Sequence, residues 1–157
     1  MDQQQEYSSV PLYSMALIKE KDIRYPVSKL SNEAVGASAL RAYLQDKDCE
    51  HMAVLMVDGA NNFIGIHLVA LGSLSRIPAI YIRDIFKAAI AGRANAIVLG
   101  HNHPSGDVLP SNEDIAFTKL AYQASNVIGV PILDHLIISS GMNDDVYSFF
   151  AHGHFNQ

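Results

Sequence analysis

GHNHPSGDVLPSNEDI (100–115) is the stretch that organises this 157-residue chain, because it joins a strand pattern to a helix pattern. The residues before it, NAIVLG (95–100), form an apolar run that predicts a short buried strand. The residues that follow, NEDIAFTKLAYQASN (112–126), predict a helix. The polar side chains therefore gather where a buried strand ends and the chain turns, through a loop with glycine and proline, into a helix.

Strand and helix patterns continue on both sides of this unit. SNEAVGASALRAYLQD (31–46) has apolar residues at helical spacing behind Ser31, which is an N-cap candidate. HMAVLMVD (51–58) and FIGIHLVALG (63–72) are apolar runs joined by turn residues, and they predict a buried hairpin. The other expected strands are 10–18, 130–139 and 146–151. Strands mixed with helices indicate one α/β sandwich, and the hairpin argues against a purely parallel sheet.

A further helix is predicted over IYIRDIFKAAIAG, where apolar residues recur at offsets of three, four, seven and eight. Gly92 is the expected C-terminal stop. The buried face of this helix is expected to consist of Ile82, Ile85, Phe86, Ala89 and Ile90.

Length and composition indicate a single domain. At 157 residues and 49% hydrophobic content, the chain can bury a substantial core. Residues 1–9 are expected to be disordered, residues 10–151 to form the domain, and residues 152–157 to be a flexible tail. With 17% charged residues and a net charge of -5, the chain lacks the basic excess of proteins that bind phosphate backbones. Strong nucleic-acid binding is therefore disfavoured.

The single cysteine, Cys49, bears on the cellular compartment. It cannot form an internal disulfide, so a cytoplasmic location is the simplest expectation. The N-terminus lacks a signal-peptide pattern, and no apolar run approaches the length that spans a membrane. Because Cys49 precedes an apolar strand, a buried small hydrophobe is expected in preference to a thiol nucleophile.

Three residues of the central stretch have the character of metal ligands. In an extended backbone, His101 and His103 point to the same side and can present both imidazoles to one ion. Asp114, in the first turn of the next helix, can complete the set. Two nitrogens and a carboxylate oxygen suit zinc and leave a fourth position for water, which is typical of a catalytic site.

Amide hydrolysis also needs a group that takes a proton from the attacking water and passes it to the leaving amine. Glu50 is the preferred candidate, because it opens the apolar strand at 51–58. Glu113 is the rival, but it is adjacent to Asp114 on a helix and so points about 100° away. Ser111 is a candidate donor to the oxyanion of the tetrahedral intermediate.

Each of these residues also has a structural interpretation. Ser111 and Asp114 fit a capping box at a helix start, which their spacing alone explains better than catalysis. His101 and His103 could be polar loop residues, since two histidines at this spacing recur by chance. Asp107 could orient substrate or cap a turn.

Two further histidine positions are interpreted as structural. His152 and His154 form a second H-x-H pattern near a polar C-terminus without an accompanying acid, which favours a surface tail. His135 follows Asp134 inside an apolar strand and could lie near the metal or close the core, and the structural role is favoured.

The sequence His101-Asn-His103-Pro104, six residues, Ser111, two residues, Asp114 resembles the motif of the JAMM metalloproteases, the MPN-plus type of MPN domain. HNHPSGD, together with LDHLII (133–138), is similar to the RadC branch of that superfamily. The similarity extends from about Cys49 to Ser139 and includes the hairpin. It therefore covers most of the chain.

This resemblance implies a three-layer α/β/α sandwich with a mixed sheet, the cytidine-deaminase-like JAB/MPN fold. It implies one zinc ion per chain on His101, His103 and Asp114, with Glu50 as the acid/base and Ser111 assisting the oxyanion. JAMM enzymes hydrolyse peptide or isopeptide bonds, often in ubiquitin-like conjugates. The implied partner is therefore a peptide or protein substrate.

The RadC branch carries a traditional DNA-repair label, which the acidic composition does not support independently. Full-length RadC proteins have an N-terminal helix-hairpin-helix region. The 48 residues before Cys49 are too few for that region together with the first strand and helix, so a short RadC-like form is expected.

Three classes of function remain open at this point. The leading one is a zinc hydrolase of amide bonds, the second a DNA-repair-associated module whose affinity for DNA weakens with salt. The third is a metal-stabilised interaction module without turnover. Glu50 favours the first over the third, because a structural zinc needs no acid/base residue. Iron or manganese could replace zinc in such a site.

Overall fold

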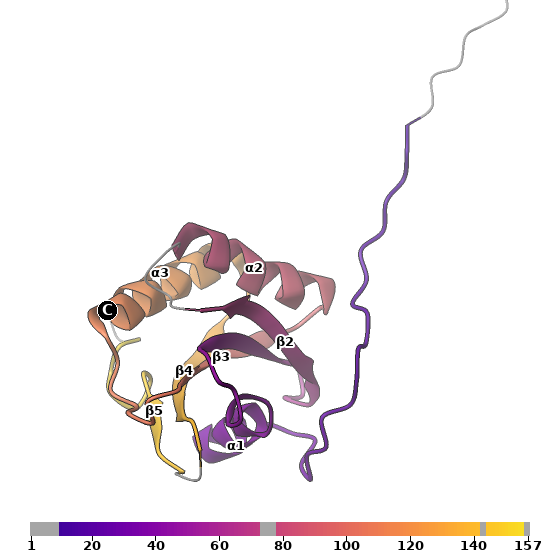
Figure 1. Cartoon of the computed structure of the whole chain (residues 1–157). Coiled ribbons are helices and arrows are strands. Elements are labelled where there is room, and N and C mark those ends of the chain that lie inside the picture. The colour runs from indigo at the N-terminus through magenta and orange to yellow at the C-terminus, as the bar shows by residue number, and fades with distance from the viewer. Residues whose placement is uncertain (1–9, 73–77, 142–143, 156–157) are drawn as a thin grey trace, which may run out of the picture.

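The apolar runs of the sequence become the strands of one sheet (Figure 1). The computed structural model describes residues 10–72, 78–141 and 144–155. Its helices are α1 (Glu33–Leu44), α2 (Pro78–Ala91) and α3 (Asn112–Ile128). Its strands are β1 (His51–Val57), β2 (Phe63–Leu71), β3 (Ala96–His103), β4 (Ile132–Ser139) and β5 (Val146–Ser148).

The sheet has the strand order β2-β1-β3-β4-β5 and is mixed, as the hairpin pattern predicts. β1 pairs antiparallel with β2 and with β3, whereas β3 and β4 run parallel and are connected through α3. β5 closes the far edge, antiparallel to β4. β3 is thus a central strand, and its C-terminal end lies beside the start of β1, where Met52 is the partner of His101.

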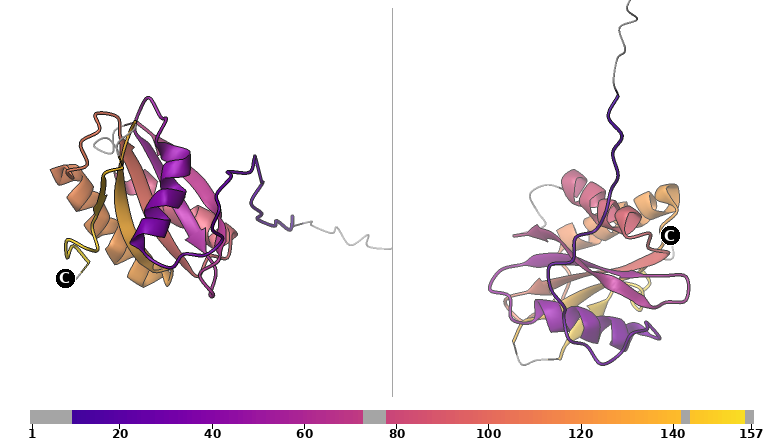
Figure 2. Two further views of the ribbon diagram at one scale, coloured as in Figure 1. Left: turned by 90° about the horizontal axis from the view of Figure 1, so that it is seen from below. Right: turned by 90° about the vertical axis from the view of Figure 1, so that its right-hand side faces the viewer.

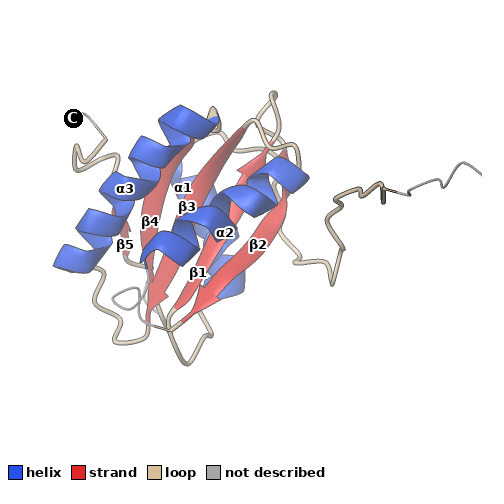
Figure 3. Cartoon of the chain, turned by 90° about the horizontal axis from the view of Figure 1, so that it is seen from above, coloured by secondary structure: helices blue, strands red, loops and turns tan. Residues whose placement is uncertain are grey.

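Helices cover both faces of the sheet, which gives the three-layer sandwich expected for the fold. α2 and α3 lie over one face and α1 over the other (Figure 3). In β1, Met52, Val54 and Met56 pack on the side of α2 and α3, while Ala53 and Leu55 pack on the side of α1. This alternation is the period of two that an extended backbone imposes, and it explains why β1 is apolar from Met52 to Val57.

Gly100 allows α1 to approach the sheet closely. A Cβ atom at position 100 would lie 2.7 Å from Cδ1 of Leu40, which is fully buried. A side chain at this position would therefore force the buried Leu40 side chain to move. The glycine that precedes His101 is a packing requirement on the face opposite the polar residues.

The face of α2 differs from the prediction at two residues, since Ile82 is only half-buried and Ile90 is exposed. Ile85, Phe86 and Ala89 are buried as expected, but Ile90 is 52% exposed and Ala88 is buried instead. Ile90 lies about 200° round the helix from Ala88, so both cannot face the sheet. The buried face of α2 therefore includes Ala88.

Among the described residues, no helix combines the length and apolar character needed to cross a membrane.

The strand expected at 10–18 is not formed. These residues have no strand partner, and the arm leaves the body of the molecule (Figure 2). Most of their large apolar side chains are exposed, including Leu12 at 97%. The only β-bridge of the N-terminal region described outside the strands joins Lys29 to Asn62. Apolar composition predicted a strand here, but the arm makes no ladder of hydrogen bonds with the sheet.

Two expectations of burial are also corrected next to β1. Cys49 is exposed, because it precedes β1 and does not share its central position in the sheet. β2 is an edge strand and is half-buried for most of its length, with Leu71 58% exposed. The hairpin therefore has one buried and one partly exposed strand.

The last described residues fold back onto the sheet. β5 ends at Ser148, earlier than the predicted end at 151. Phe149 is fully buried, and Phe155 is 7% exposed in the core beneath α3. Residues 152–155 are therefore not a flexible tail, because the phenylalanine side chain anchors them. Residues 1–9 and 156–157 lie outside the described residues.

Candidate metal centre

His101 and His103 lie on the face of β3 that α3 covers. Residues two apart on a strand share a face, and the preceding members of this series, Ile97 and Leu99, belong to the core beneath α2 and α3. β3 extends to His103, three residues beyond the predicted strand end. His101 is fully buried, whereas the side chain of His103 is 19% exposed. The strand thus presents one inner and one outer imidazole.

The N-terminus of α3 brings Asp114 to these histidines. Ser111 is the N-cap, and a capping box is present: the Ser111 hydroxyl accepts from the Asp114 backbone N–H at 3.1 Å, and the Asp114 carboxylate accepts from the Ser111 backbone N–H at 2.8 Å. The Ser111 hydroxyl also donates to the same carboxylate oxygen at 2.7 Å. Capping therefore accounts for Ser111 and fixes the orientation of Asp114.

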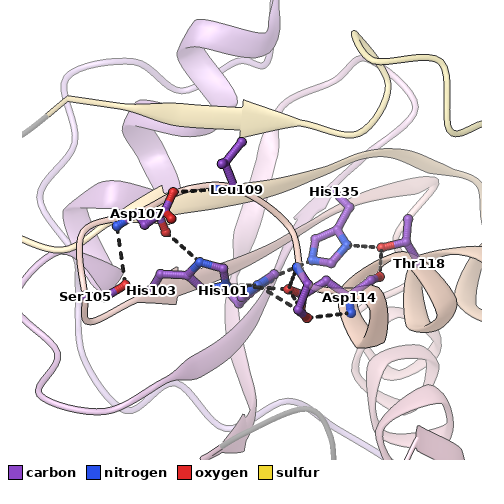
Figure 4. A network of polar contacts seen from close by, with 9 residues as sticks. His101, His103, Ser105, Asp107, Leu109, Asp114, Thr118 and His135 are labelled. Atoms are coloured by element: carbon purple, nitrogen blue, oxygen red, sulfur yellow. Dashed lines mark hydrogen bonds and ion pairs between the residues drawn. The ribbon is translucent and has the colours of Figure 1, made fainter.

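The three side chains converge on a common point (Figure 4). Nε2 of His101 lies 3.1 Å from Nε2 of His103 and 3.3 Å from Oδ1 of Asp114. Nε2 of His103 lies 3.6 Å from Oδ2 of Asp114. Contacts this close between groups that can each donate a lone pair are typical of a site that holds a cation.

Glu50 joins this group from the start of β1. One potential ligand atom from each of Glu50, His101, His103 and Asp114 lies within 4.8 Å of all the others. The even-numbered residues of β1 face α2 and α3, and Glu50 continues that series two residues before Met52. Among the described residues, Glu113 does not belong to this group, and its side chain is exposed. The structure brings together the residues preferred from the sequence.

Asn102, which the sequence analysis did not single out, holds the backbone on both sides of Glu50. Its Oδ1 accepts from the His51 backbone N–H at 2.7 Å, and its Nδ2 donates to the Cys49 carbonyl at 3.1 Å. A further bond runs from Nδ2 to the Ser140 hydroxyl at 3.1 Å. Asn102 is fully buried on β3 between the two histidines. The strand that carries two candidate ligands therefore also positions the candidate acid/base.

The loop after β3 selects the ring nitrogen that His103 presents. Its Nδ1 lies 2.6 Å from the carbonyl oxygen of Asp107. A carbonyl can only accept, so Nδ1 carries a proton and Nε2 is the atom that faces the centre. The Asp107 carboxylate accepts from the Leu109 backbone N–H at 2.9 Å. Asp107 therefore caps a turn, one of the two roles considered from the sequence.

The electrostatics favour a charged His103 beside an ionised Asp114. The hydrogen bond to Asp114 raises the pKa of His103 above its ordinary value, in spite of burial, and the nearby Glu50 acts in the same direction. Burial alone would raise the pKa of the Asp114 carboxyl, but its close contacts with both histidine rings and the hydrogen bond from Ser111 together hold it far below its usual range. A divalent cation would compete with the proton on His103 for the same lone pair.

The donor set fits a metal ion. Two imidazole nitrogens and a carboxylate oxygen are ligands of the kind that zinc takes, and a fourth group, Glu50, lies within reach. The ligands come from a central strand and from a capped helix start, which are rigid elements. The cluster can therefore bind a metal ion without a large rearrangement of the backbone.

The other residues considered from the sequence lie outside this group. Among the described residues, His152 and His154 do not belong to it and lie beside Tyr147 after β5. Cys49 precedes Glu50, but its sulfur contacts the His51 ring at 3.7 Å. His135 is fully buried on β4 and stacks on Phe149, as a core residue would. Burial lowers the pKa of His135 well below its ordinary value.

Comparison with known proteins places these features in one family. The family described as RadC-like JAB domain matches residues 30–154. A UPF0758 protein of Chlorobaculum parvum is 36% identical over 143 residues, which is 88% of this chain and 63% of that protein. A UPF0758 protein of Caldanaerobacter subterraneus is 45% identical over 92 residues, which is 59% of this chain and 39% of that protein. The chain thus spans less than two thirds of the length of these relatives.

Proposed function

The chain belongs to the RadC-like JAB domain family, and from this premise we propose that it is a zinc-dependent hydrolase of amide bonds. The observation that carries the proposal is the convergence of Glu50, His101, His103 and Asp114 within 4.8 Å. In the proposed arrangement, His101, His103 and Asp114 hold the ion, and one coordination position stays open. Zinc in such a site lowers the pKa of a water molecule to about 7 and polarises a carbonyl group.

Glu50 is proposed as the acid/base. It reaches the centre from a strand different from the one that carries the histidines, and Asn102 fixes the backbone on both sides of it. A carboxylate in this position can take a proton from the attacking water and return it to the nitrogen of the leaving amine. Positioned proton transfer of this kind contributes roughly 100-fold to 10,000-fold to a rate.

Ser111 is proposed to assist the oxyanion with its hydroxyl. In the observed geometry this hydroxyl donates to the Asp114 carboxylate at 2.7 Å. To donate to a substrate oxygen, it would have to turn away from Asp114 while its backbone N–H keeps the cap. The oxyanion role thus requires a change of hydroxyl rotamer and no movement of the helix.

The proposed substrate is a peptide or protein, cleaved at a peptide or isopeptide bond. The JAMM resemblance supports this class, and ubiquitin-like conjugates are one form of it. A DNA-repair role is compatible with the family, but the net charge of -5 gives it no support. Hydrolysis of an amide bond is therefore the reaction to be tested.

One observation favours a second candidate, a metal-stabilised interaction module without turnover. Asp114 and the histidines connect α3 to β3, so a bound ion would tie the helix to the sheet. Glu50 is close enough to be a fourth ligand, which would leave no open position. The two candidates thus differ in the role of Glu50.

The Glu50→Gln variant distinguishes them, with Glu113→Gln as the matched control from the nearby helix. Metal content is measured by plasma mass spectrometry, and cleavage with a panel of fluorogenic peptide and isopeptide substrates. For a hydrolase we expect Glu50→Gln to keep zinc and to lose activity about 100-fold or more, while Glu113→Gln keeps both. Loss of zinc in Glu50→Gln would identify a fourth ligand and favour the interaction module. Zinc-loaded wild type that cleaves none of the substrates would contradict the hydrolase proposal.

A further inference from the structure

Behind the candidate metal centre, a buried chain of polar contacts connects His101 to Asp114 through His135 and Thr118, which do not belong to the group of candidate ligands (Figure 4). Nδ1 of His101 lies 2.9 Å from Nε2 of His135 on β4. Nδ1 of His135 lies 2.6 Å from the hydroxyl of Thr118 on α3. That hydroxyl donates to the backbone carbonyl of Asp114 at 2.6 Å. His101, His135 and Thr118 are all buried.

The direction of each hydrogen bond in this chain follows from its last member. A carbonyl accepts only, so the single proton of the Thr118 hydroxyl goes to Asp114. The hydroxyl oxygen must then accept the proton on Nδ1 of His135. A neutral His135 has its lone pair on Nε2, which can only accept from Nδ1 of His101. Nδ1 of His101 therefore carries a proton, and the lone pair on its Nε2 faces the centre.

We propose that His135 and Thr118 are positioning residues that select the metal-binding tautomer of His101. The proposal rests on the proposed function only in that the centre holds zinc. His103 receives the same selection from the backbone carbonyl of Asp107. A buried carbonyl or carboxylate usually serves this purpose for a histidine ligand. Here two side chains, His135 and Thr118, serve this purpose and are called the relay below. The relay ends at the backbone carbonyl of Asp114, which is itself a candidate ligand.

The packing around His135 holds the relay in place. Its ring stacks on Phe149, with centroids 4.7 Å apart and the planes inclined by 10°. The ring of Phe117, from α3, lies edge-on to it, with centroids 6.1 Å apart and the planes inclined by 68°. A half-turn of the ring would place carbon atoms against both Thr118 and His101 and leave the buried Nδ1 of His101 without its partner, which is unfavourable. Tertiary packing thus fixes the direction of the relay.

The experiment compares Thr118→Val with Ser125→Ala, a matched control on the same helix. Both side chains are 2% exposed, and both hydroxyls donate to a carbonyl of α3, which for Ser125 is that of Tyr122. Only the Thr118 hydroxyl also accepts from a histidine. The first readout is the tautomer of His101 in metal-free protein, read from the ¹⁵N shifts of its ring. The second is the zinc dissociation constant by competition with a chromophoric chelator.

We expect His101 to carry its proton on Nδ1 in wild type and in Ser125→Ala, and to lose this preference in Thr118→Val. Zinc binding should weaken about 10-fold or more in Thr118→Val, as for other partners behind a ligand, and should be unchanged in Ser125→Ala. Thr118→Ser, which restores the hydroxyl, should restore both readouts. A loss of folding stability alone would not change the tautomer of His101, and it would not produce the recovery expected in Thr118→Ser.

Three results would overturn the proposal: a proton on Nε2 of His101 in metal-free wild type, unchanged zinc affinity in Thr118→Val, or equal weakening in Ser125→Ala. Neither readout uses a substrate, so the test is separate from that of hydrolysis. Protein that shows the expected tautomer and zinc affinities but cleaves no amide would support the positioning roles of His135 and Thr118 and contradict the proposed function.

Discussion

The chain contains the pattern H-x-H twice, and the two copies have different surroundings. His101 and His103 occupy a central strand and share a face with the start of α3, where Asp114 meets them at 3.3 Å and 3.6 Å. His152 and His154 lie in the turns after β5. Nε2 of His154 contacts the Tyr147 hydroxyl at 3.0 Å, and the His152 ring stacks on Tyr147 at 4.0 Å.

The difference shows that spacing alone does not make a metal site. An extended strand directs alternate side chains to one side, where other elements can add an acid. In the second copy Nδ1 of His152 lies 2.7 Å from the Ser148 carbonyl, and the ring of His154 lies against Phe149. Within the part of the chain that the structure describes, no carboxylate completes a cluster with this second pair.

The largest expected effect comes from removing one histidine of the first pair. We expect His103→Ala to lose bound zinc, because two protein ligands would remain, and to lose amide hydrolysis with it. The double variant His152→Ala, His154→Ala should keep one zinc per chain. Metal analysis of both proteins after dialysis checks this. A lower zinc content in the His152→Ala, His154→Ala variant would contradict this distinction between the two pairs.

A smaller effect is expected from Asn102→Ala, which leaves the ligands in place but removes the amide that holds the backbone around Glu50. The buried His51 N–H would lose its partner, so we expect a loss of about 1–3 kcal/mol in the free energy of unfolding. The turnover number should fall by roughly 10-fold to 100-fold through misplacement of Glu50, with zinc retained. Asn95→Ala, at an exposed position just before β3, is the control and should change neither quantity.

The pH dependence of zinc binding should separate the two pairs further. The pKa of His103 lies above its ordinary value, chiefly because of its hydrogen bond to Asp114. Zinc needs the unprotonated nitrogen, so its affinity should fall as the pH decreases through the raised pKa of His103. Chelator competition between pH 6 and 9 measures this, and the His152, His154 double variant should give the same curve as wild type. A flat wild-type curve would contradict the assignment of His103.

The raised pKa of His103 has the opposite effect on the stability of the metal-free protein, which should decrease as the pH rises. A histidine with a raised pKa in the folded state stabilises that state fully below its unfolded pKa of about 6.5. This contribution is lost as the pH rises through the raised value. Urea unfolding of metal-free protein should therefore show a decline in this range that His103→Ala lacks.

The smallest effect is expected from Tyr147→Phe in the second pair. The variant removes the hydroxyl that contacts His154 but keeps the ring that stacks on His152. We expect a loss of about 0.5–1.5 kcal/mol in urea unfolding and unchanged zinc affinity. A clear change in zinc affinity would show that the C-terminal turns affect the centre through Phe149 and His135.

Local sequence patterns allowed much of the fold to be predicted. The predictions failed where contacts with residues far away in the sequence determine the structure. Buried strands and capped helices are encoded by neighbouring residues, so β1, β3 and α3 were expected close to their observed positions. The stretch at 10–18 has the composition of a strand but no partner in the sheet. Phe155 is anchored by a core that the sequence of the C-terminus does not indicate.

The same distinction applies to the candidate centre. His101, His103 and Asp114 are encoded within 14 residues, and their convergence follows from a strand, a turn and a helix cap. Glu50 needs the antiparallel pairing of β1 with β3, which sets Met52 opposite His101. The role of Asn102 depends on that same pairing, and nothing in its sequence neighbourhood indicates it.

By itself, the sequence determined the element pattern, the mixed sheet and the residues from which a metal centre can be built. These depend on the periodicity of backbone conformations and on local hydrogen bonds, which neighbouring residues control. Only the tertiary structure decided the partners behind the centre, because the parallel register of β3 and β4 pairs Leu99 with His135 and so brings His135 to His101. Register results from the packing of the whole sheet, and contacts across it are the part that a linear pattern does not contain.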